Sequence, residues 1–202
     1  MSALMKSGTS RHPELERIAR ALSVRVPTPA ERDEPFGEAA VALVLHAGDD
    51  GLEALFIKRA TRTGDPWSGQ IALPGGRRHE GENSLLFTAM RETCEEIGLD
   101  LAVHGELLGE LDELRPRNPY LPPIIVRPYV FAIRARPTLV HSEEVAESFW
   151  APLRHVFDPG RRREVTIDIR GGQLQRPAIM IDEHVIWGMT DSILCTFEAL
   201  WR

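Results

Sequence analysis

Two apolar stretches near the start of the chain have the pattern of paired strands. Residues 39–47 (AAVALVLHA) and 52–60 (LEALFIKRA) are short apolar runs of the length expected for buried strands. They are separated by Gly-Asp-Asp-Gly, which supplies residues that adopt the positive φ angles of a tight hairpin. We therefore predict that the two segments pair as antiparallel neighbours.

Three other segments repeat apolar residues at a helical spacing. Residues 12–22 carry apolar side chains three and four positions apart, and a proline near their start suits a first helical turn. Residues 82–97 show the same periodicity and precede Gly98, a residue typical of helix C-caps. Residues 190–201 form the last such segment, with Thr190 as its predicted N-cap. We predict a helix in each segment.

Further apolar runs predict more strands, so the fold mixes strands and helices. The segment 143–157 is predicted to start extended and to end as a short helix. The other predicted strands are 70–73, 103–114, 124–137, 163–169 and 177–187, of which the last two form a hairpin. An α+β fold or a three-layer α/β/α arrangement follows, with a mixed sheet crossed by two or three helices. Prolines and mixed charge at 23–37 indicate a linker, which divides the chain into an N-terminal helix and linker (1–37) and one domain (38–202).

Composition narrows the classes of function. The chain has 202 residues, of which 43% are hydrophobic and 27% charged, as expected for one soluble globular domain. Its formal charge of −6 argues against a general nucleic-acid binder, because such proteins carry a basic surplus on one face. No run of about 18 apolar residues is present, so we predict no membrane span. An anionic substrate would then need local positive charge, such as a metal ion.

The predicted compartment is the cytoplasm. The first 22 residues lack the apolar core and the small-residue cleavage site of a secretory signal. The two cysteines, Cys94 and Cys195, lie within apolar helical patterns, which predicts buried reduced thiols rather than a disulfide.

The helix predicted at 82–97 has two sharply different faces. A helical projection places Arg91, Glu92, Glu95 and Glu96 on one face, and on the other Leu86, Met90, Thr93, Cys94 and Ile97. Carboxylates gathered on one face repel each other unless a positive group lies nearby. One interpretation is a solvated face on which Arg91 and Glu95 form an i,i+4 ion pair; the other is a metal site.

Two glycines before this helix favour the metal site. Gly75 and Gly76 allow unusual backbone conformations, so the main-chain carbonyl of Gly76 can turn toward the acidic face. Carboxylate and carbonyl oxygens are ligands that suit Mg²⁺ or Mn²⁺, which keep several waters and bridge to substrate phosphates. The scattered histidines show no zinc-ligand spacing.

This stretch resembles the signature of the Nudix hydrolase family. That signature is a glycine, five residues, a glutamate, seven residues, then Arg-Glu-aliphatic-any-Glu-Glu-any-Gly-aliphatic. Its fixed positions are filled here by Gly76, Glu82, Arg91, Glu92, Glu95, Glu96, Gly98 and Leu99. Two departures occur: eight residues separate Glu82 from Arg91, and Thr93 stands at the aliphatic position after Glu92. The longer spacing leaves the segment from 92 to 96 intact and puts the role of Glu82 in question.

The resemblance implies a metal-dependent hydrolase that attacks a diphosphate with water. It implies that Glu92, Glu95 and Glu96 hold one to three Mg²⁺ or Mn²⁺ ions together with the Gly76 carbonyl, and that Arg91 orients the glutamates. Glu95, Glu96 and Arg91 are the implied catalytic residues. The general base stays open between Glu95 and Glu96, with Glu143, Glu144 and Glu147 as rivals.

The sequence before the helix resembles an additional signature of Nudix enzymes that cleave coenzyme A. Arg59 and the stretch 69–74 (GQIALP) fit that signature, while Trp67 stands where it has histidine. The segment 187–190 (WGMT) also looks like a stretch that precedes the last helix in those enzymes. The implied substrate-binding residues are Arg59, Arg77, Gln70 and Trp67, since arginines pair with phosphate oxygens and tryptophan stacks on adenine or packs on the strand below.

Other functions remain open. One is hydrolysis of a different nucleoside diphosphate derivative, such as a dinucleotide, an ADP-sugar or an oxidised nucleotide. The other is a ligand-sensing module, although the three glutamates are retained and residues 1–37 contain no basic recognition helix. The expected partner is a small molecule, without nucleic acid or membrane. The apolar stripe of the helix at 12–22 fits either a homodimer contact or packing on its own domain.

Overall fold

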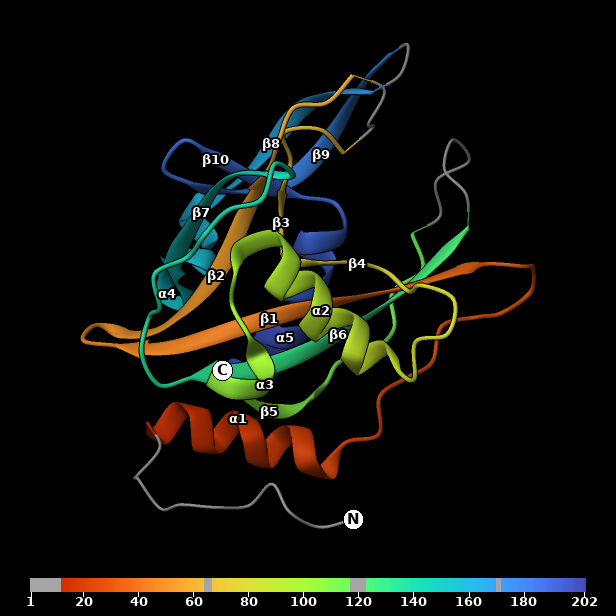
Figure 1. The fold of residues 1–202 in the computed structure, drawn as a ribbon. Helices are drawn as coiled ribbons and strands as arrows, with labels where there is room; N and C mark the ends of the chain where they lie inside the picture. The colour runs from red at the N-terminus through yellow and green to blue at the C-terminus, as the bar shows by residue number, and fades with distance from the viewer. Residues whose placement is uncertain (1–11, 64–66, 117–122, 170–171) are drawn as a thin grey trace.

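A seven-stranded mixed sheet forms the centre of the protein. The computed structural model describes residues 12–63, 67–116, 123–169 and 172–202. The main path of the sheet has the order β3-β2-β1-β6-β5; β4 also pairs with β1, and β7 with β2 (Figure 1). Its strands are β1 (Gly37–Gly48), β2 (Gly51–Arg59), β3 (Ile71–Ala72), β4 (Gly75–Arg77), β5 (Gly105–Glu110), β6 (Ile124–Ile133) and β7 (Val145–Pro152). β1 and β6 run parallel and the other pairs antiparallel, which confirms the predicted mixed sheet.

The predicted hairpin near the start of the chain is confirmed. β1 and β2 are antiparallel, and Gly48 lies opposite Gly51, so Asp49 and Asp50 form the two-residue turn. Away from this turn the two strands have different neighbours: β4 pairs with the start of β1, and β3 and β7 pair with the end of β2.

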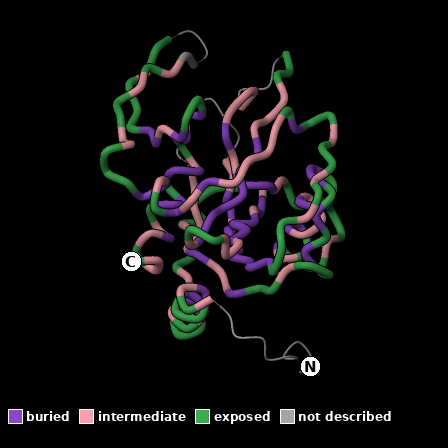
Figure 2. Tube along the Cα trace, turned by 90° about the vertical axis from the view of Figure 1, so that its left-hand side faces the viewer, coloured by how far each residue is buried: buried purple, intermediate pink, exposed green. Residues whose placement is uncertain are grey.

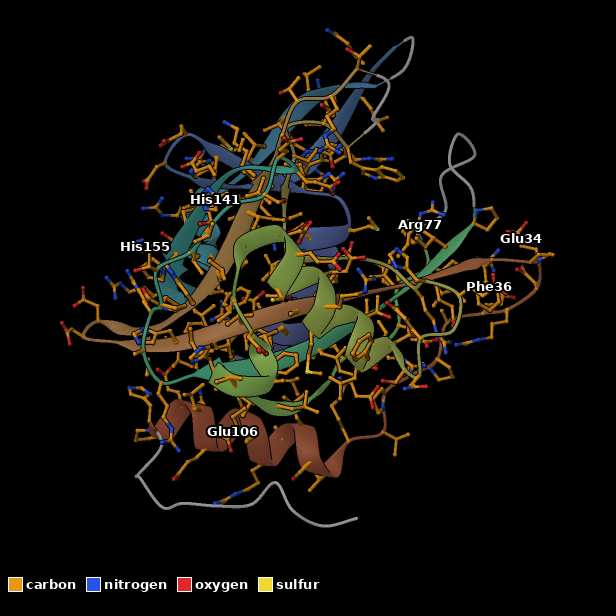
Figure 3. All side chains as sticks on the ribbon, viewed as in Figure 1. Glu34, Phe36, Arg77, Glu106, His141 and His155 are labelled. Carbon is orange, nitrogen blue, oxygen red and sulfur yellow. The ribbon has the colours of Figure 1, made fainter. Side chains whose placement is uncertain are left out.

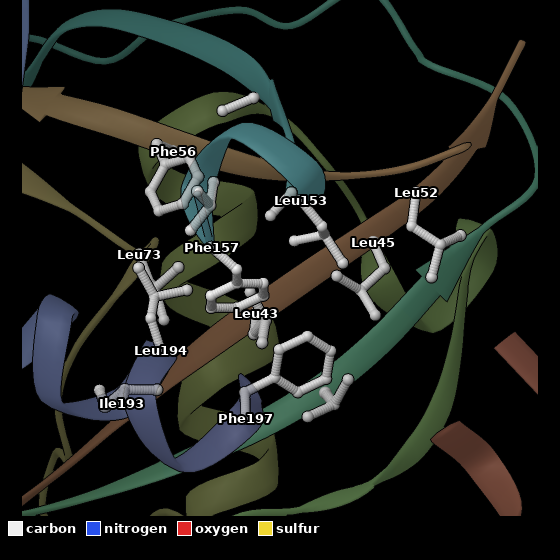
Figure 4. Close-up of a cluster of buried hydrophobic side chains, with 14 of the residues drawn as sticks. Leu43, Leu45, Leu52, Phe56, Leu73, Leu153, Phe157, Ile193, Leu194 and Phe197 are labelled. Atoms are coloured by element: carbon white, nitrogen blue, oxygen red, sulfur yellow. The ribbon is translucent and has the colours of Figure 1, made fainter. Parts of the chain in front are cut away.

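Helices cover both faces of the central sheet, as the predicted three-layer arrangement requires. They are α1 (Pro13–Val24), α2 (Leu85–Ile97), α3 (Leu101–His104), α4 (Leu153–Val156) and α5 (Met189–Trp201), with a 3₁₀ turn, η1, at Pro159–Arg161. One core, the α2-side core, contains Leu55, Ile57, Ala89, Ile97 and Phe131. The other, the α5-side core, contains Leu43, Leu45, Phe56, Leu153, Phe157 and Phe197 (Figure 4). Alternate residues of β2 enter different cores, as the period of two along a strand dictates.

The N-terminal helix packs on its own domain. Leu15, Ile18 and Leu22 of α1 are buried in the α5-side core, and the helix contacts β5 and α5. Figure 2 shows this helix with an exposed outer side and buried residues on its inner side. Of the two interpretations of its apolar stripe, packing on its own domain is therefore observed. The homodimer stays a prediction.

A second, three-stranded sheet stands beside the first. β8 (Arg162–Ile169), β9 (Gly172–Ile181) and β10 (His184–Trp187) are antiparallel neighbours in the order β10-β9-β8. The predicted hairpin is confirmed as β8 and β9, but the segment 177–187 is two strands and not one. Asp182, with φ of 52°, and Glu183 form a tight turn within it.

Several other predicted boundaries are wrong. The segment 103–114 begins with α3, which Asp100 caps by accepting a hydrogen bond from the N–H of Ala102. The last helix starts after Gly188, and Thr190 is buried inside it with its hydroxyl donating to the carbonyl of Ile71 at 3.2 Å.

The predicted burial of the two cysteines is also wrong. Both are exposed thiols, because Cys94 and Cys195 lie on the outer sides of α2 and α5. Within the described part of the chain, all helices are too short or too polar to span a bilayer.

Candidate active site on the acidic helix

Local sequence determines where α2 begins and ends. Ser84 caps its start, with the side-chain oxygen accepting a hydrogen bond from the N–H of Phe87 at 3.1 Å. Gly98 ends it in the left-handed conformation (φ 69°) and donates to the carbonyl of Cys94 at 2.9 Å. The predicted C-cap is confirmed, and the predicted start at residue 82 is three residues early.

The buried face of α2 differs from the predicted one. Its buried residues are Leu85, Thr88, Ala89, Thr93, Glu96 and Ile97, whereas Cys94 is exposed. The helix packs on β1 and β4, so the short strand β4 covers the side on which Glu96 lies. A carboxylate is therefore part of the buried face, whereas the helical projection separated Glu96 from the apolar residues.

Arg91 joins three of the glutamates. Its Nε donates to Glu82 Oε1 at 2.5 Å, Nη1 to Glu95 Oε2 at 2.7 Å and Nη2 to Glu92 Oε1 at 2.8 Å. A further bond runs from Nη2 to the carbonyl of Arg77 at 3.2 Å. The guanidinium is largely buried, so it holds these carboxylates in one orientation. The i,i+4 pair of Arg91 and Glu95 is present as one part of this network.

Glu82 belongs to the same network although its spacing is unusual. Its carboxylate also accepts hydrogen bonds from Thr88 Oγ1 and from the N–H of His79. Burial by itself would raise the pKa of Glu82, but the hydrogen bonds from Thr88 and Arg91 outweigh it and lower the pKa to about 2. Glu82 is thus a permanently charged partner that fixes Arg91.

The two glycines permit close approaches rather than a turn. Gly75 and Gly76 lie in β4, which pairs with β1 opposite Val41 and Ala40. Gly75 has φ of 149°, and a Cβ there would lie 2.3 Å from the carbonyl oxygen of Ala40. A Cβ on Gly76 would lie 2.5 Å from the carboxyl carbon of Glu92. The missing side chains let the main chain lie directly against the acidic face.

Two of the glutamates are in surroundings that disfavour their charge. Burial raises the pKa of Glu96 to about 8, and the charge of Glu92 adds to this, although a 2.9 Å hydrogen bond from the N–H of Gly75 opposes it. Burial also raises the pKa of Glu92, against the opposing hydrogen bond from Arg91. Glu95 is 58% exposed at its side chain. This excess of carboxylate is the arrangement that a divalent cation would stabilise.

The predicted substrate-binding residues lie in three places. Arg59 ends β2 on the side of α2, close enough to Glu96 for its charge to lower the pKa of that carboxyl. The Arg77 side chain lies beside Gly37 at the start of β1, on the same side of the molecule as Phe36 (Figure 3). Gln70 lines a cavity of about 330 Å³ with Trp187.

Trp67 lies in the turn before Gln70. Its side chain is partly buried, and its carbonyl accepts a hydrogen bond from the N–H of Gln70 at 3.2 Å. The structure therefore brings Arg59 to the glutamates and places Gln70 and Trp67 on the loop that leads to β3.

The alternative acids also separate in space. Glu144 pairs with Arg62 at 3.0 Å, and its charge helps to raise the pKa of Glu96, so it lies near the acidic face. Glu147 pairs instead with His184, whose ring stacks on Phe149 beside the α5-side core. Thr88, which donates to Glu82, and the N–H of Gly75, which donates to Glu96, were missed as partners of the glutamates. No sequence pattern marks the Gly75 contact, because it depends on β4 packing against α2.

A family comparison agrees with this geometry. A model described as NUDIX domain matches residues 36–168. The chain belongs to the NUDIX domain family. The match starts one residue before β1 and includes α2 and β7, so this NUDIX domain contains every strand of the central sheet.

Curated relatives and a solved structure are similar to the same region. An uncharacterized protein of Schizosaccharomyces pombe is 36% identical over 118 residues, covering 56% of this chain and 36% of that protein. The uncharacterized Nudix hydrolase NudL of Photorhabdus laumondii is 28% identical over 142 residues, covering 69% of this chain and 73% of that protein. The chain thus spans about a third of the first relative and about three quarters of the second.

An Ap4A hydrolase from Caenorhabditis elegans has the same fold. It aligns with a TM-score of 0.57 and 15% identity, covering 81% of this chain and 96% of that chain. At this identity the likeness shows the fold, and it agrees with the mixed sheet between helices described above.

Proposed function

We propose that this NUDIX domain is a metal-dependent diphosphatase that hydrolyses a nucleoside diphosphate derivative, with coenzyme A or an acyl derivative of it as the substrate. The observation that carries the proposal is the gathering of Glu92 and Glu95 around Arg91, with Glu96 close to Glu92 and the main chain of β4 in direct contact. Carboxylate oxygens in excess over local positive charge are a donor set for a hard divalent cation.

The residues present fit Mg²⁺ or Mn²⁺. The three glutamates and the carbonyl of Gly76 are oxygen donors. Because Gly76 has no Cβ, its main chain lies directly against the Glu92 carboxylate. When bound, the metal neutralises charge on the diphosphate and lowers the pKa of the attacking water. Arg91 is anchored by Glu82 and holds the carboxylates of Glu92 and Glu95 in place through hydrogen bonds.

The chain also offers groups for proton transfer and phosphate binding. Glu95 is exposed and is itself one of the proposed metal donors, and Glu144 is the rival acid that lies near Glu96; either would accept the proton of the attacking water. Arg59 lies beside Glu96 and supplies a guanidinium for phosphate oxygens. The resemblance of residues 59–74 to the coenzyme A signature supports that substrate, with 4′-phosphopantetheine and adenosine 3′,5′-bisphosphate as products.

Product analysis tests the proposal directly. The purified protein is incubated with coenzyme A, NADH, ADP-ribose and a diadenosine polyphosphate, with and without Mg²⁺ or Mn²⁺, and the products are identified by mass spectrometry. Glu95→Gln is the test variant, and Glu80→Gln, an exposed acid of the preceding turn, is the matched control.

Each outcome has a distinct meaning. Metal-dependent release of the two coenzyme A fragments, lost in Glu95→Gln and kept in Glu80→Gln, supports the whole proposal. Cleavage of another compound with coenzyme A intact overturns the substrate and keeps the chemistry. Binding without turnover of any compound overturns the enzyme and favours a ligand-sensing module.

A further inference from the structure

A second group of metal-ligand side chains lies away from the acidic helix. Glu147 of β7, Glu183 of the β9–β10 turn and His184 of β10 have ligand atoms that all lie within 4.8 Å of one another. Glu147 Oε1 is 3.4 Å from His184 Nε2. An imidazole nitrogen beside two carboxylates is a ligand set found in sites for zinc and other first-row transition metals.

The fold fixes the histidine of this group. The His184 ring is 6% exposed and stacks on Phe149, with ring centroids 3.9 Å apart and an interplanar angle of 11°. Phe149 in turn stacks on Phe56 of the α5-side core. The tight turn at Asp182 and Glu183 then brings the second carboxylate beside the ring. The imidazole is therefore preorganised, with its Nε2 facing Glu147.

A cavity adjoins the group. Glu183 and His184 line the cavity of about 330 Å³ that also contains Gln70 and Trp187. Lys58, which lies directly opposite Glu147 in the β2–β7 pair, lines it as well. Three protein ligands beside an open space match a metal site that keeps one position for water or a ligand.

The sheet separates this group from the acidic helix. Lys58 and Arg59 are consecutive on β2 and point to opposite faces, Lys58 to the cavity and Arg59 to the side of Glu96. Because His184 stacks above the α5-side core and Glu96 lies by the α2-side core, one ion cannot occupy both places.

We propose that Glu147, Glu183 and His184 form a second divalent-cation site, selective for a transition metal such as Zn²⁺ over Mg²⁺. The site links β7 of the central sheet to the β9–β10 turn, so a bound ion holds the second sheet against the central sheet. The imidazole gives the selectivity, because Mg²⁺ prefers oxygen ligands.

The test measures zinc binding in the full chain by competition with a chromogenic chelator. The background carries Glu92→Gln and Glu95→Gln, so that zinc held by the acidic helix is not counted. Glu183→Gln and His184→Gln are added singly, and Glu164→Gln, an exposed acid of the second sheet, is the control. Circular dichroism checks that each variant is folded, and Glu183→Gln keeps the test valid because its side chain lies in an exposed turn.

We expect one equivalent of Zn²⁺ in the background protein and in Glu164→Gln, with Mg²⁺ failing to displace it. Each ligand variant should bind zinc more weakly by more than about tenfold, since even changes to residues that hydrogen-bond to metal ligands lower metal affinity that much. Zinc should also raise the melting temperature of the background protein but not of Glu183→Gln. Equal zinc affinity in all variants, or no zinc binding by the background protein, would overturn the proposal. Lys58 would then be the group that balances the carboxylates of Glu147 and Glu183.

Discussion

Two buried charge clusters of this protein differ in how their charges are balanced. Near the turn of the β1–β2 hairpin, the single carboxylate of Glu53 accepts two hydrogen bonds from the guanidinium of Arg136. The same carboxylate lies 2.8 Å from His46 Nδ1. Burial and the charge of Arg136 lower the pKa of His46, so the imidazole stays neutral and the pair is one to one. On α2, one guanidinium serves three carboxylates and a fourth, Glu96, lies beside them.

The two clusters differ in role: the Glu53 cluster stabilises the fold, and the α2 cluster is the candidate for function. Arg136 also stacks over the Trp150 ring at 5.4 Å, so the Glu53 cluster is complete without further ligands. The α2 cluster remains negative after every hydrogen bond is counted, and burial raises the pKa values of Glu92 and Glu96 within it. A buried cluster with excess negative charge destabilises the fold unless a cation binds to it, whereas a balanced cluster needs no cation.

The largest expected effect is on activity at α2. Glu92→Gln removes a proposed metal donor without changing the side-chain shape, and we expect kcat/KM for the proposed diphosphate substrate to fall by about 10²–10³-fold. The thermal stability of the metal-free variant should be equal or higher, because repulsion with Glu96 is relieved. Steady-state kinetics and melting curves measure both quantities. A variant with lower stability and unchanged activity would place Glu92 among structural charges.

The balanced cluster should give the opposite result. Glu53→Gln leaves Arg136 without its anionic partner, and we expect the free energy of unfolding to fall by about 2–3 kcal/mol. Urea denaturation measures this, with Glu198→Gln, whose partner Arg202 is exposed, as a control expected to cost less than about 1 kcal/mol. The kcat/KM of folded Glu53→Gln should match that of the wild type; a large loss would show that this cluster also serves the reaction.

A glycine substitution tests the contact between β4 and α2. In Gly76→Ala the new Cβ would meet the Glu92 carboxylate, which must move. We expect Mn²⁺ affinity to fall by about tenfold, as for other changes that misorient a metal ligand. Titration calorimetry measures the affinity, and Gly172→Ala, which has open space around it, is the control. Unchanged affinity would show that the close approach is not needed for metal binding.

The smallest effect concerns pH. Because the pKa of Glu96 is about 8 in the folded state and 4.5 when the group is unperturbed, as in the unfolded chain, the folded state holds its proton more tightly, and this stabilisation is lost as pH rises from about 4.5 to 8. In EDTA, the melting temperature of the wild type should fall more steeply over this range than that of Glu96→Gln. Mg²⁺ should reduce the difference, since it stabilises the ionised carboxylate. Parallel curves with and without the substitution would contradict this account.

Local signals in the sequence predicted those parts of the fold that depend on near neighbours. The Gly-Asp-Asp-Gly turn gives the β1–β2 hairpin, and Gly98 ends α2 in the left-handed conformation. By contrast, the predicted glycine turn is the strand β4, because residues 75–77 pair with β1, more than thirty positions earlier. The split of 177–187 at Asp182 was also missed, since its turn lacks glycine.

The sequence by itself determined the mixed α+β fold, the family of the domain and the clustering of Glu92, Glu95 and Glu96 on one helix, because helical spacing and turn chemistry are local properties. Only the tertiary structure decided which of these acids is buried and which charge each one meets. Glu96 is buried because β4 covers it, Glu82 reaches Arg91 across a turn, and Glu147 meets His184 rather than the acidic helix. Burial and charge pairing depend on segments distant in sequence, and they set the pKa values on which the chemistry rests.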